Sequence, residues 1–245
     1  MLTRRKFIAA SAAAATYVAT RAGLAEAQLK PKNNKPAKEQ PMTYTVREEL
    51  KPSNLNGISQ EQIEQHWNLY KGYVAQSNGL KDELEALRKD GKGGTALFAD
   101  RRRRYGFEFC GMVLHEYYFG NLKAGIADTA AADFKAAVAK SWGSFDAWKE
   151  DFINCGKSRS IGWAVCALDP QTGDLNNHFI QLHEEGGVLG YHPVLVMDVW
   201  EHAYMVDHSA AGRGDYINAF FSNVNWATVE ARLKDGQAQK TSKRF

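Results

Sequence analysis

The sequence predicts an α+β protein, in which an N-terminal antiparallel helical hairpin precedes a C-terminal α/β domain with a three-stranded antiparallel sheet. Two observations predict this fold class. From Ser59 to about residue 125, apolar side chains recur at helical spacing. After residue 160, three short runs rich in β-branched and aromatic residues follow one another, with turn residues between them.

The predicted hairpin begins at Ser59, because Gln62 three residues later completes the sequence pattern of a capping box. A glycine cluster at residues 91–94 divides the helical pattern into two long segments. Two helices joined by a short turn pack antiparallel. We therefore expect His66 on the first helix to lie close to His115 on the second.

The second half of the chain alternates between helical and strand-like patterns. We predict helices at 130–142 and 144–154, strands at 162–168, 178–182 and 193–199, and closing helices at 216–221 and 226–233. The Asp-Pro-Gln-Thr-Gly sequence at 169–173 is typical of a turn, so the first two strands should pair antiparallel.

The N-terminus has the pattern of an export signal of the twin-arginine (Tat) type. Arg4 and Arg5 precede an alanine-rich stretch, and Ala25–Ala27 form a small-x-small cleavage site. We expect cleavage after Ala27 and a periplasmic or extracellular protein. The apolar stretch is short, which predicts no stable membrane span, although an uncleaved anchor stays an alternative. The predicted segments are the signal (1–27), a Lys/Pro-rich linker and arm (28–56), the helical hairpin domain (57–125), the C-terminal α+β domain (126–236) and a polar tail (237–245).

Removing the predicted signal makes the chain formally neutral. The full chain has 31 basic and 28 acidic side chains, of which four and one lie in residues 1–27, so 27 of each remain. This charge balance gives no electrostatic argument for a nucleic-acid partner, and we expect no such partner. Any attraction of an anionic ligand has to come from local charges.

The segment from Val194 to Tyr204 contains the strongest chemical signal. Its apolar, β-branched beginning predicts a buried strand that ends at Asp198, and a helical turn should place His202 beside that carboxylate. A carboxylate and an imidazole in apolar surroundings are costly unless a partner or a cation compensates them. The pair therefore suggests a metal site, although Asp-x-x-x-His alone also fits a salt bridge or a hydrogen-bonded core histidine.

Two further histidines lie in similar surroundings. His66 shares a predicted helix face with Tyr70 and Tyr73, and His115 shares one with Tyr118. Each alone also fits a core histidine bonded to a carbonyl. Together with Asp198 and His202 they form a nitrogen-rich set with one carboxylate, which suits iron, manganese or zinc and leaves a coordination position open.

With these motifs in order, residues 42–233 resemble the iron/manganese superoxide dismutases. The most specific match is the sequence Asp-Val-Trp-Glu-His-Ala-Tyr at 198–204. The other matches are Ile63–His66 followed by Tyr73, Val74 and Asn78, His115 followed by Tyr118 and Phe119, and weaker ones at 142–146, 162–163 and 224–226.

The resemblance implies a dismutase with the metal between its two domains, which converts superoxide to dioxygen and hydrogen peroxide at one iron or manganese ion per subunit. We favour iron. The implied ligands are His66, His115, Asp198 and His202. The resemblance also implies a homodimer through Glu201 and His202, and leaves a tetramer open.

The resemblance further implies residues around the metal. Tyr73 should line the substrate gateway, and Trp163 and Trp200 should wall the pocket. Gly111 stands four residues before the second histidine ligand, so no glutamine comes from there to contact the metal-bound solvent. We expect His183, on a strand, in that role, with Gln181 as the fallback.

Two departures from the family pattern affect proton delivery. Met205 stands where the family usually has a tyrosine, and the stretch 67–72 lacks the usual histidine and is one residue shorter. In the family these two residues bond each other, so their joint loss leaves no unpaired partner. We expect an intact metal site with altered rate or pH dependence. The alternatives are an exported, non-catalytic dimeric metal-binding module and another iron or manganese oxidase.

Two remaining features are interpreted as structural. Cys110, Cys155 and Cys166 lack metal-ligand spacing and fit apolar core positions, although one disulfide is an alternative. Arg101–Arg104 point all round a helix and indicate a solvated helix start rather than a binding stripe.

Overall fold

The structure is a computed structural model that describes residues 43–239. The predicted export signal, most of the linker and the end of the polar tail lie outside the described residues. Among the described residues, no helix combines the length and the apolar character that a membrane crossing requires. The described part begins with an extended arm and a short 3-10 helix, η1 (Glu48–Leu50).

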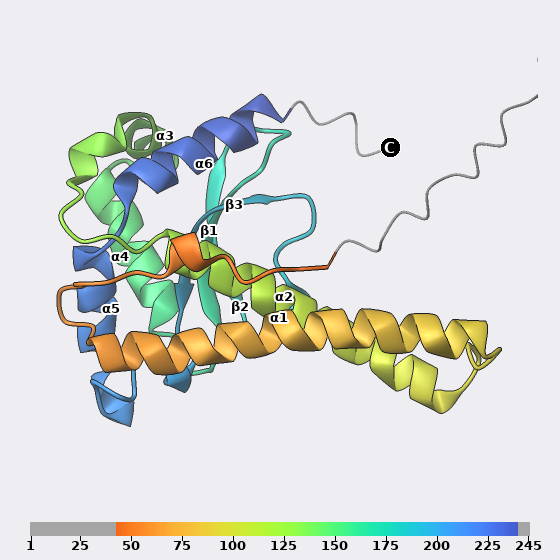
Figure 1. Cartoon of the computed structure of the whole chain (residues 1–245). Coiled ribbons are helices and arrows are strands. Elements are labelled where there is room, and N and C mark those ends of the chain that lie inside the picture. Colours follow the sequence, from red (N-terminus) through yellow and green to blue (C-terminus); the bar gives the residue numbers. More distant parts are fainter. Residues whose placement is uncertain (1–42, 240–245) are drawn as a thin grey trace, which may run out of the picture. The chain divides into compact units, whose positions relative to one another are not determined.

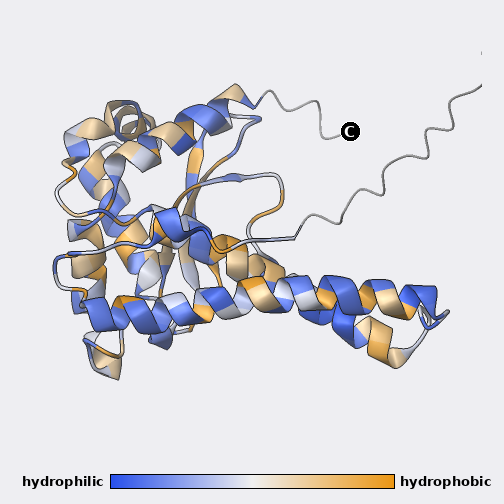
Figure 2. Ribbon diagram, viewed as in Figure 1, coloured by the Kyte–Doolittle hydropathy of each residue, from blue (hydrophilic) through white to orange (hydrophobic). Residues whose placement is uncertain are grey.

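Helices α1 (Gln60–Lys89) and α2 (Ala96–Gly120) form the predicted antiparallel hairpin (Figure 1). Each begins at a side-chain cap: Oγ of Ser59 accepts the Gln62 N–H at 3.0 Å, and Oγ1 of Thr95 accepts the Phe98 N–H at 3.2 Å. The far ends of both helices extend beyond the sheet. Figure 2 shows many hydrophilic residues along α1 with hydrophobic ones between them, and hydrophobic stretches within the sheet.

The C-terminal half contains a three-stranded antiparallel sheet of order β2-β1-β3. Its strands are β1 (Trp163–Leu168), β2 (Leu175–Ile180) and β3 (His192–Asp198). Trp163, at the start of the central strand, lies opposite both Ile180 and Asp198. Every residue of β1 is buried because neighbouring strands and helices cover it.

The prediction for the second strand was displaced toward the C-terminus. We expected residues 178–182, but pairing begins at Leu175, because the turn closes tightly with the Gly173 N–H donating to the carbonyl of Asp169 at 2.8 Å. The start of this edge strand is polar, with partly exposed Asn176 and Asn177, so it lacks an apolar signal. Residues 181–182 are exposed and lie outside the strand.

The remaining helices surround the sheet. They are η2 (Asp128–Ala130), α3 (Ala132–Trp142), α4 (Phe145–Gly156), η3 (His183–Glu185), η4 (Glu201–Ala203), η5 (Ala210–Gly212), α5 (Arg213–Ser222) and α6 (Trp226–Ala238). Helix α4 contacts β1 and β2, and α6 contacts β1 and β3. The predicted α+β fold class, with a helical hairpin followed by a three-stranded antiparallel sheet, is confirmed.

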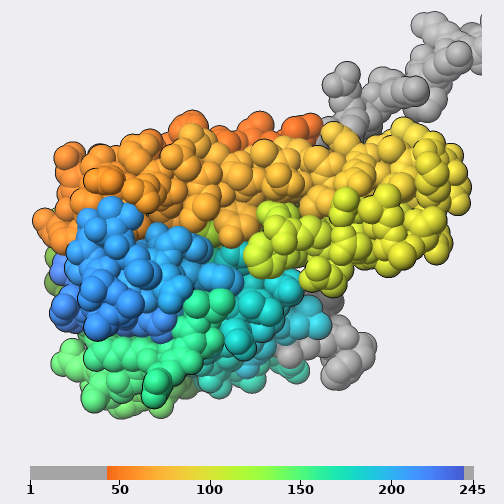
Figure 3. Space-filling view, turned by 90° about the horizontal axis from the view of Figure 1, so that it is seen from below, coloured from red at the N-terminus to blue at the C-terminus, as the bar shows by residue number. Residues whose placement is uncertain are grey.

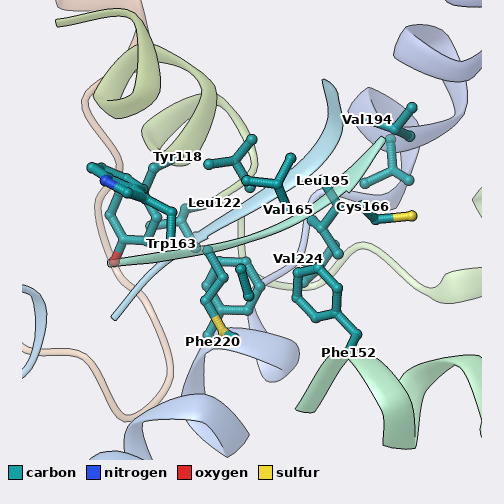
Figure 4. Close-up of a cluster of buried hydrophobic side chains, with 14 of the residues drawn as sticks. Tyr118, Leu122, Phe152, Trp163, Val165, Cys166, Val194, Leu195, Phe220 and Val224 are labelled. Atoms are coloured by element: carbon teal, nitrogen blue, oxygen red, sulfur yellow. The ribbon is translucent and has the colours of Figure 1, made fainter. Parts of the chain in front are cut away.

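One hydrophobic core joins the hairpin to the sheet. Figure 4 shows Tyr118 from the end of α2 and Leu122 just after it, in a cluster with Trp163 and Val165 of β1 and Phe220 of α5. Burying large apolar and aromatic side chains contributes about 2 kcal/mol each before entropy is counted. This core fixes the end of α2 against the strands.

The expected core position is found for Cys166 but only in part for Cys110 and Cys155, and most of the arginine run is exposed as expected. Cys166 is buried, Cys110 and Cys155 are partly buried, and all three are free. In the run 101–104 of α2, Arg101 pairs with Glu83 and Arg104 with Glu108.

Candidate metal centre

Four side chains that are distant in the sequence converge between the hairpin and the sheet. His66 comes from α1, His115 from α2, Asp198 from the last position of β3 and His202 from η4. One potential ligand atom from each lies within 4.8 Å of all the others. His66, His115 and Asp198 are buried, and the side chain of His202 is 22% exposed.

Asp198 is oriented by the turn that follows it. Its Oδ1 accepts the N–H of Trp200 at 2.8 Å, and its backbone carbonyl accepts the hydroxyl of Tyr216 at 2.7 Å. These two bonds hold Oδ1 and the backbone carbonyl of Asp198 in place. The other carboxylate oxygen, Oδ2, faces the imidazoles. It lies 3.1 Å from Nε2 of His66 and 3.2 Å from Nε2 of His202.

The arrangement of His115 fits a bound cation. Its Nδ1 donates to the carbonyl of Gly111 at 2.6 Å, since a carbonyl can only accept. Nε2 of the neutral ring therefore carries a lone pair. Within residues 43–239 this nitrogen has no hydrogen-bond partner, and it lies 3.7 Å from Oδ2 of Asp198. A lone pair and a carboxylate oxygen repel each other unless a positive charge lies near both.

The electrostatics favour a metal ion over a proton as that charge. Burial and the neighbouring His66 keep the pKa of His115 well below its ordinary value, and burial lowers the pKa of His66 as well. Burial alone raises the pKa of Asp198, but His202 and His66 outweigh it and hold this pKa below its ordinary value. The site therefore offers the neutral imidazoles of His66 and His115, the imidazole of His202 and one carboxylate, a set of ligand atoms that iron and manganese accept.

Gln62 positions His202, and the sequence did not indicate this role. Its Nε2 donates to the carbonyl of His202 at 2.7 Å, and its Oε1 accepts the N–H of Val206 at 2.9 Å. The capping-box prediction was therefore half wrong, because the Ser59 N–H donates to Asp207 instead of to Gln62. Figure 3 shows α1 in orange beside the blue segment that carries His202.

Tyr73 and His183 form a hydrogen-bonded pair beside the four candidate ligands. Oη of Tyr73 lies 2.8 Å from Nε2 of His183, and the ring of Tyr73 lies 4.9 Å from that of His115. Gly111 makes this contact possible, because a Cβ there would lie 2.8 Å from the Tyr73 ring and 3.2 Å from His183. Burial raises the pKa of Tyr73, so the phenol stays protonated at neutral pH.

His183 does not lie on a strand as predicted. It is a fully buried residue of η3, where its Nδ1 accepts the indole N–H of Trp163 at 3.1 Å. Gln181, the fallback, is exposed, and its backbone N–H donates to Glu185. The strand ended earlier than expected, so the predicted alternation of faces does not apply to His183.

Aromatic rings enclose the cluster. The rings of Trp163 and His115 are 5.0 Å apart in an edge-to-face arrangement, and Trp200 stacks on His202 with an interplanar angle of 19°. These rings limit the access of water to the candidate ligands. The expected pocket walls, Trp163 and Trp200, are therefore next to the cluster.

Comparison with known proteins extends these observations. Residues 130–232 match the family model described as iron/manganese superoxide dismutases, C-terminal domain. The chain is also 35% identical to a protein named superoxide dismutase [Fe] from Aquifex aeolicus, over 77% of this chain and 90% of the relative. The chain belongs to the iron/manganese superoxide dismutase family.

Relatives within this family are named for either metal. The chain is 31% identical to superoxide dismutase [Mn] 2 of Haloferax volcanii, over 72% of this chain and 87% of the relative. It is 32% identical to superoxide dismutase [Fe] of Methanothermobacter marburgensis, over 73% of this chain and 89% of the relative. The region matched by the family model contains Asp198 and His202, whereas His66 and His115 precede it.

Proposed function

We propose that this chain is a superoxide dismutase that binds one iron or manganese ion through His66, His115, Asp198 and His202. The single observation that carries the proposal is the unprotonated Nε2 of His115, which faces a buried carboxylate oxygen at 3.7 Å. The family resemblance to dismutases of both metals supports the same reading.

A bound iron or manganese ion would supply one-electron redox chemistry, through which two superoxide ions and two protons give dioxygen and hydrogen peroxide. The protein's own residues control the surroundings of that reaction. Asp198 is the only acidic side chain among the four proposed ligands, so a bound divalent or trivalent ion would leave the site with a net positive charge for an anionic substrate. Tyr73 is a protonated phenol beside the candidate ligands and can donate a hydrogen bond to that substrate.

The intact Tyr73–His183 pair favours an enzyme over a non-catalytic metal-binding module. For the metal we propose iron. The test is metal analysis of the purified protein, together with a superoxide disproportionation assay on iron-loaded and manganese-loaded samples. The matched control is Asp198→Asn, which keeps the size of the side chain but removes its charge. We expect about one ion per chain, dismutation well above that of free iron, and loss of both in the variant.

Three results would contradict the proposal in whole or in part. An ion that binds without dismutation would indicate the metal-binding module. Iron bound equally well by Asp198→Asn would show that the ion lies elsewhere. Activity with manganese alone would overturn the choice of iron and leave the reaction in place.

We further propose that the chain forms a homodimer through Glu201 and His202. The supporting observation is a shallow hollow beside the partly exposed His202, lined by Gln65, Leu69, Glu201, His202, Met205 and Val206. Leu69, Met205 and Val206 are 42%, 48% and 38% exposed and line this one hollow, and apolar side chains exposed together are typical of interaction surfaces. A second copy would cover this surface and the edge of His202.

We also propose export by the Tat-type signal, on the basis of Arg4, Arg5 and the alanine-rich stretch. The test is cell fractionation of the full chain in a host with a twin-arginine system. We expect processed protein outside the cytoplasm, and retention when both arginines are replaced by lysine. Equal export of that variant would argue against this route.

A further inference from the structure

We infer that Trp163 holds His183 in the Nε2–H tautomer, so that His183 gives its only N–H to Tyr73 and the hydroxyl proton of Tyr73 becomes the donor available to the metal-bound solvent or substrate. This deepens the proposed function and rests on it for its catalytic meaning, whereas the tautomer is a property of the protein without metal. It makes Trp163 a positioning residue that acts through His183.

The argument begins at the indole of Trp163. An indole nitrogen can donate a hydrogen bond but cannot accept one. Its contact with Nδ1 of His183, at 3.1 Å, therefore requires a lone pair on Nδ1. Both side chains are fully buried. Trp163 is also held in the central strand by pairing with Ile180 and Asp198, so the donor is fixed in place.

The orientation of the imidazole ring is fixed as well. A 180° flip of the imidazole about χ2 would put carbon atoms at both nitrogen positions. It would break the hydrogen bonds to Trp163 and Tyr73 together. Each lost bond would leave a buried polar group without a partner, at a cost of about 1–3 kcal/mol. Cδ2 of His183 instead faces Gly111, where a Cβ would lie 3.2 Å away.

The position of the ring proton of His183 follows from this lone pair. A neutral imidazole carries a single N–H, and with a lone pair on Nδ1 this N–H is at Nε2. Nε2 lies 2.8 Å from Oη of Tyr73, so His183 donates and Tyr73 accepts. Burial, the largest influence, lowers the pKa of His183 to about 4, so the ring is neutral at pH 7.

Tyr73 therefore keeps its own hydroxyl proton for another acceptor. Among residues 43–239, His183 is the only hydrogen-bond partner found for this hydroxyl. The centre of the Tyr73 ring lies 4.9 Å from that of the His115 ring, so the phenol is beside a candidate metal ligand. A side-chain amide at position 183 would have two N–H groups and could serve Tyr73 and a second acceptor together, which an imidazole cannot do.

The test is ¹⁵N–¹H NMR of the full chain without metal, labelled with ¹⁵N-histidine, at pH 7. For His183 we expect a protonated Nε2 and an unprotonated Nδ1. Trp163→Phe should give a mixture of tautomers, because it removes the donor and keeps an aromatic ring. The matched control is Trp200→Phe, since the Trp200 ring lies 4.7 Å from the His183 ring but its indole nitrogen has no hydrogen-bond partner.

The control variant should keep the wild-type His183 signals, and Tyr73→Phe should make the Nε2 proton exchange faster with water. A wild-type ring protonated at Nδ1 would overturn the inference, even if Trp163→Phe failed to fold. An unchanged tautomer in a folded Trp163→Phe protein would do the same. Because these spectra need neither metal nor activity, a protein that failed to dismute superoxide could still have the predicted tautomer, so the two proposals fail separately.

Discussion

The side chain of Gln62, in the first turn of α1, is bonded directly to the backbone of the candidate ligand His202. Nε2 of Gln62 donates to the carbonyl of His202 at 2.7 Å, and the side chain is 1% exposed. The residue therefore couples the start of the hairpin to the turn that follows the sheet.

Gln62→Ala should destabilise the protein by about 2 kcal/mol, because it leaves the His202 carbonyl without a partner and opens a small cavity. It should also weaken metal binding, since the turn is no longer fixed. Urea unfolding and metal titration measure the two effects. Gln60→Ala is the control, because Gln60 is exposed and its side chain donates to Glu64, which is also exposed. An equal loss in both variants would contradict the specific role of Gln62.

Gly111→Ala should destabilise the protein and disturb Tyr73. A new Cβ would lie 2.8 Å from the Tyr73 ring, closer than real contacts allow. Gly106→Ala is a matched control in the same helix, because nothing lies within 4 Å of its Cβ position. There the better helix propensity of alanine should stabilise the protein by about 0.5–1 kcal/mol. Thermal unfolding of the two variants measures the change in stability, and a stabilised Gly111→Ala protein would contradict the close contact between position 111 and the Tyr73 ring.

The metal-free protein should lose stability in mild acid through His183. Its pKa is about 4 in the folded protein, while an unfolded histidine has a pKa of about 6.5. The unfolded chain therefore takes up a proton first, and the contribution to stability is complete above about pH 6.5 and falls as the pH drops toward 4.

Between pH 7 and pH 5 this effect amounts to about 2 kcal/mol. His183→Gln should therefore lose about that much less stability than the wild type over the same range. Urea unfolding at the two pH values gives the difference. If both proteins lost equal stability, the acid sensitivity would have to come from other groups.

Leu69→Asp should convert the proposed dimer to a monomer at micromolar concentration, because it places a charge in the apolar hollow beside His202. Light scattering after size-exclusion chromatography measures the mass. Leu97→Asp is the control, since Leu97 is 45% exposed, close to the 42% of Leu69, but lies at the start of α2 outside this hollow. A wild-type monomer, or dissociation in both variants, would refute the proposed interface.

The long helices and the central strand could be predicted because their signals are local. Ser59 marks the start of α1 through a cap that the structure contains, and the apolar run before Asp198 is a buried strand. The convergence of the two hairpin histidines also follows from local pattern plus antiparallel packing. His66 and His115 indeed lie with their ring centres 4.9 Å apart.

The roles that could not be predicted depend on contacts between distant segments. Gln62 has the sequence position of a capping residue, and only the packing of η4 against α1 gives its side chain another partner. The bond from Trp163 to His183 depends on where β2 ends, and the sequence pattern placed that end at residue 182 instead of Ile180. A useful signal for both would have been a polar residue on an otherwise buried face.

The positions of the four candidate ligands along the chain also determine when during synthesis an ion can bind. His202 stands late in the chain, so the hairpin alone, even fully folded, offers only two imidazoles. Complete coordination has to wait until nearly all of the polypeptide has left the ribosome and the last strand has joined the sheet. The cellular compartment in which that final step happens decides which pool of ions the nascent protein samples.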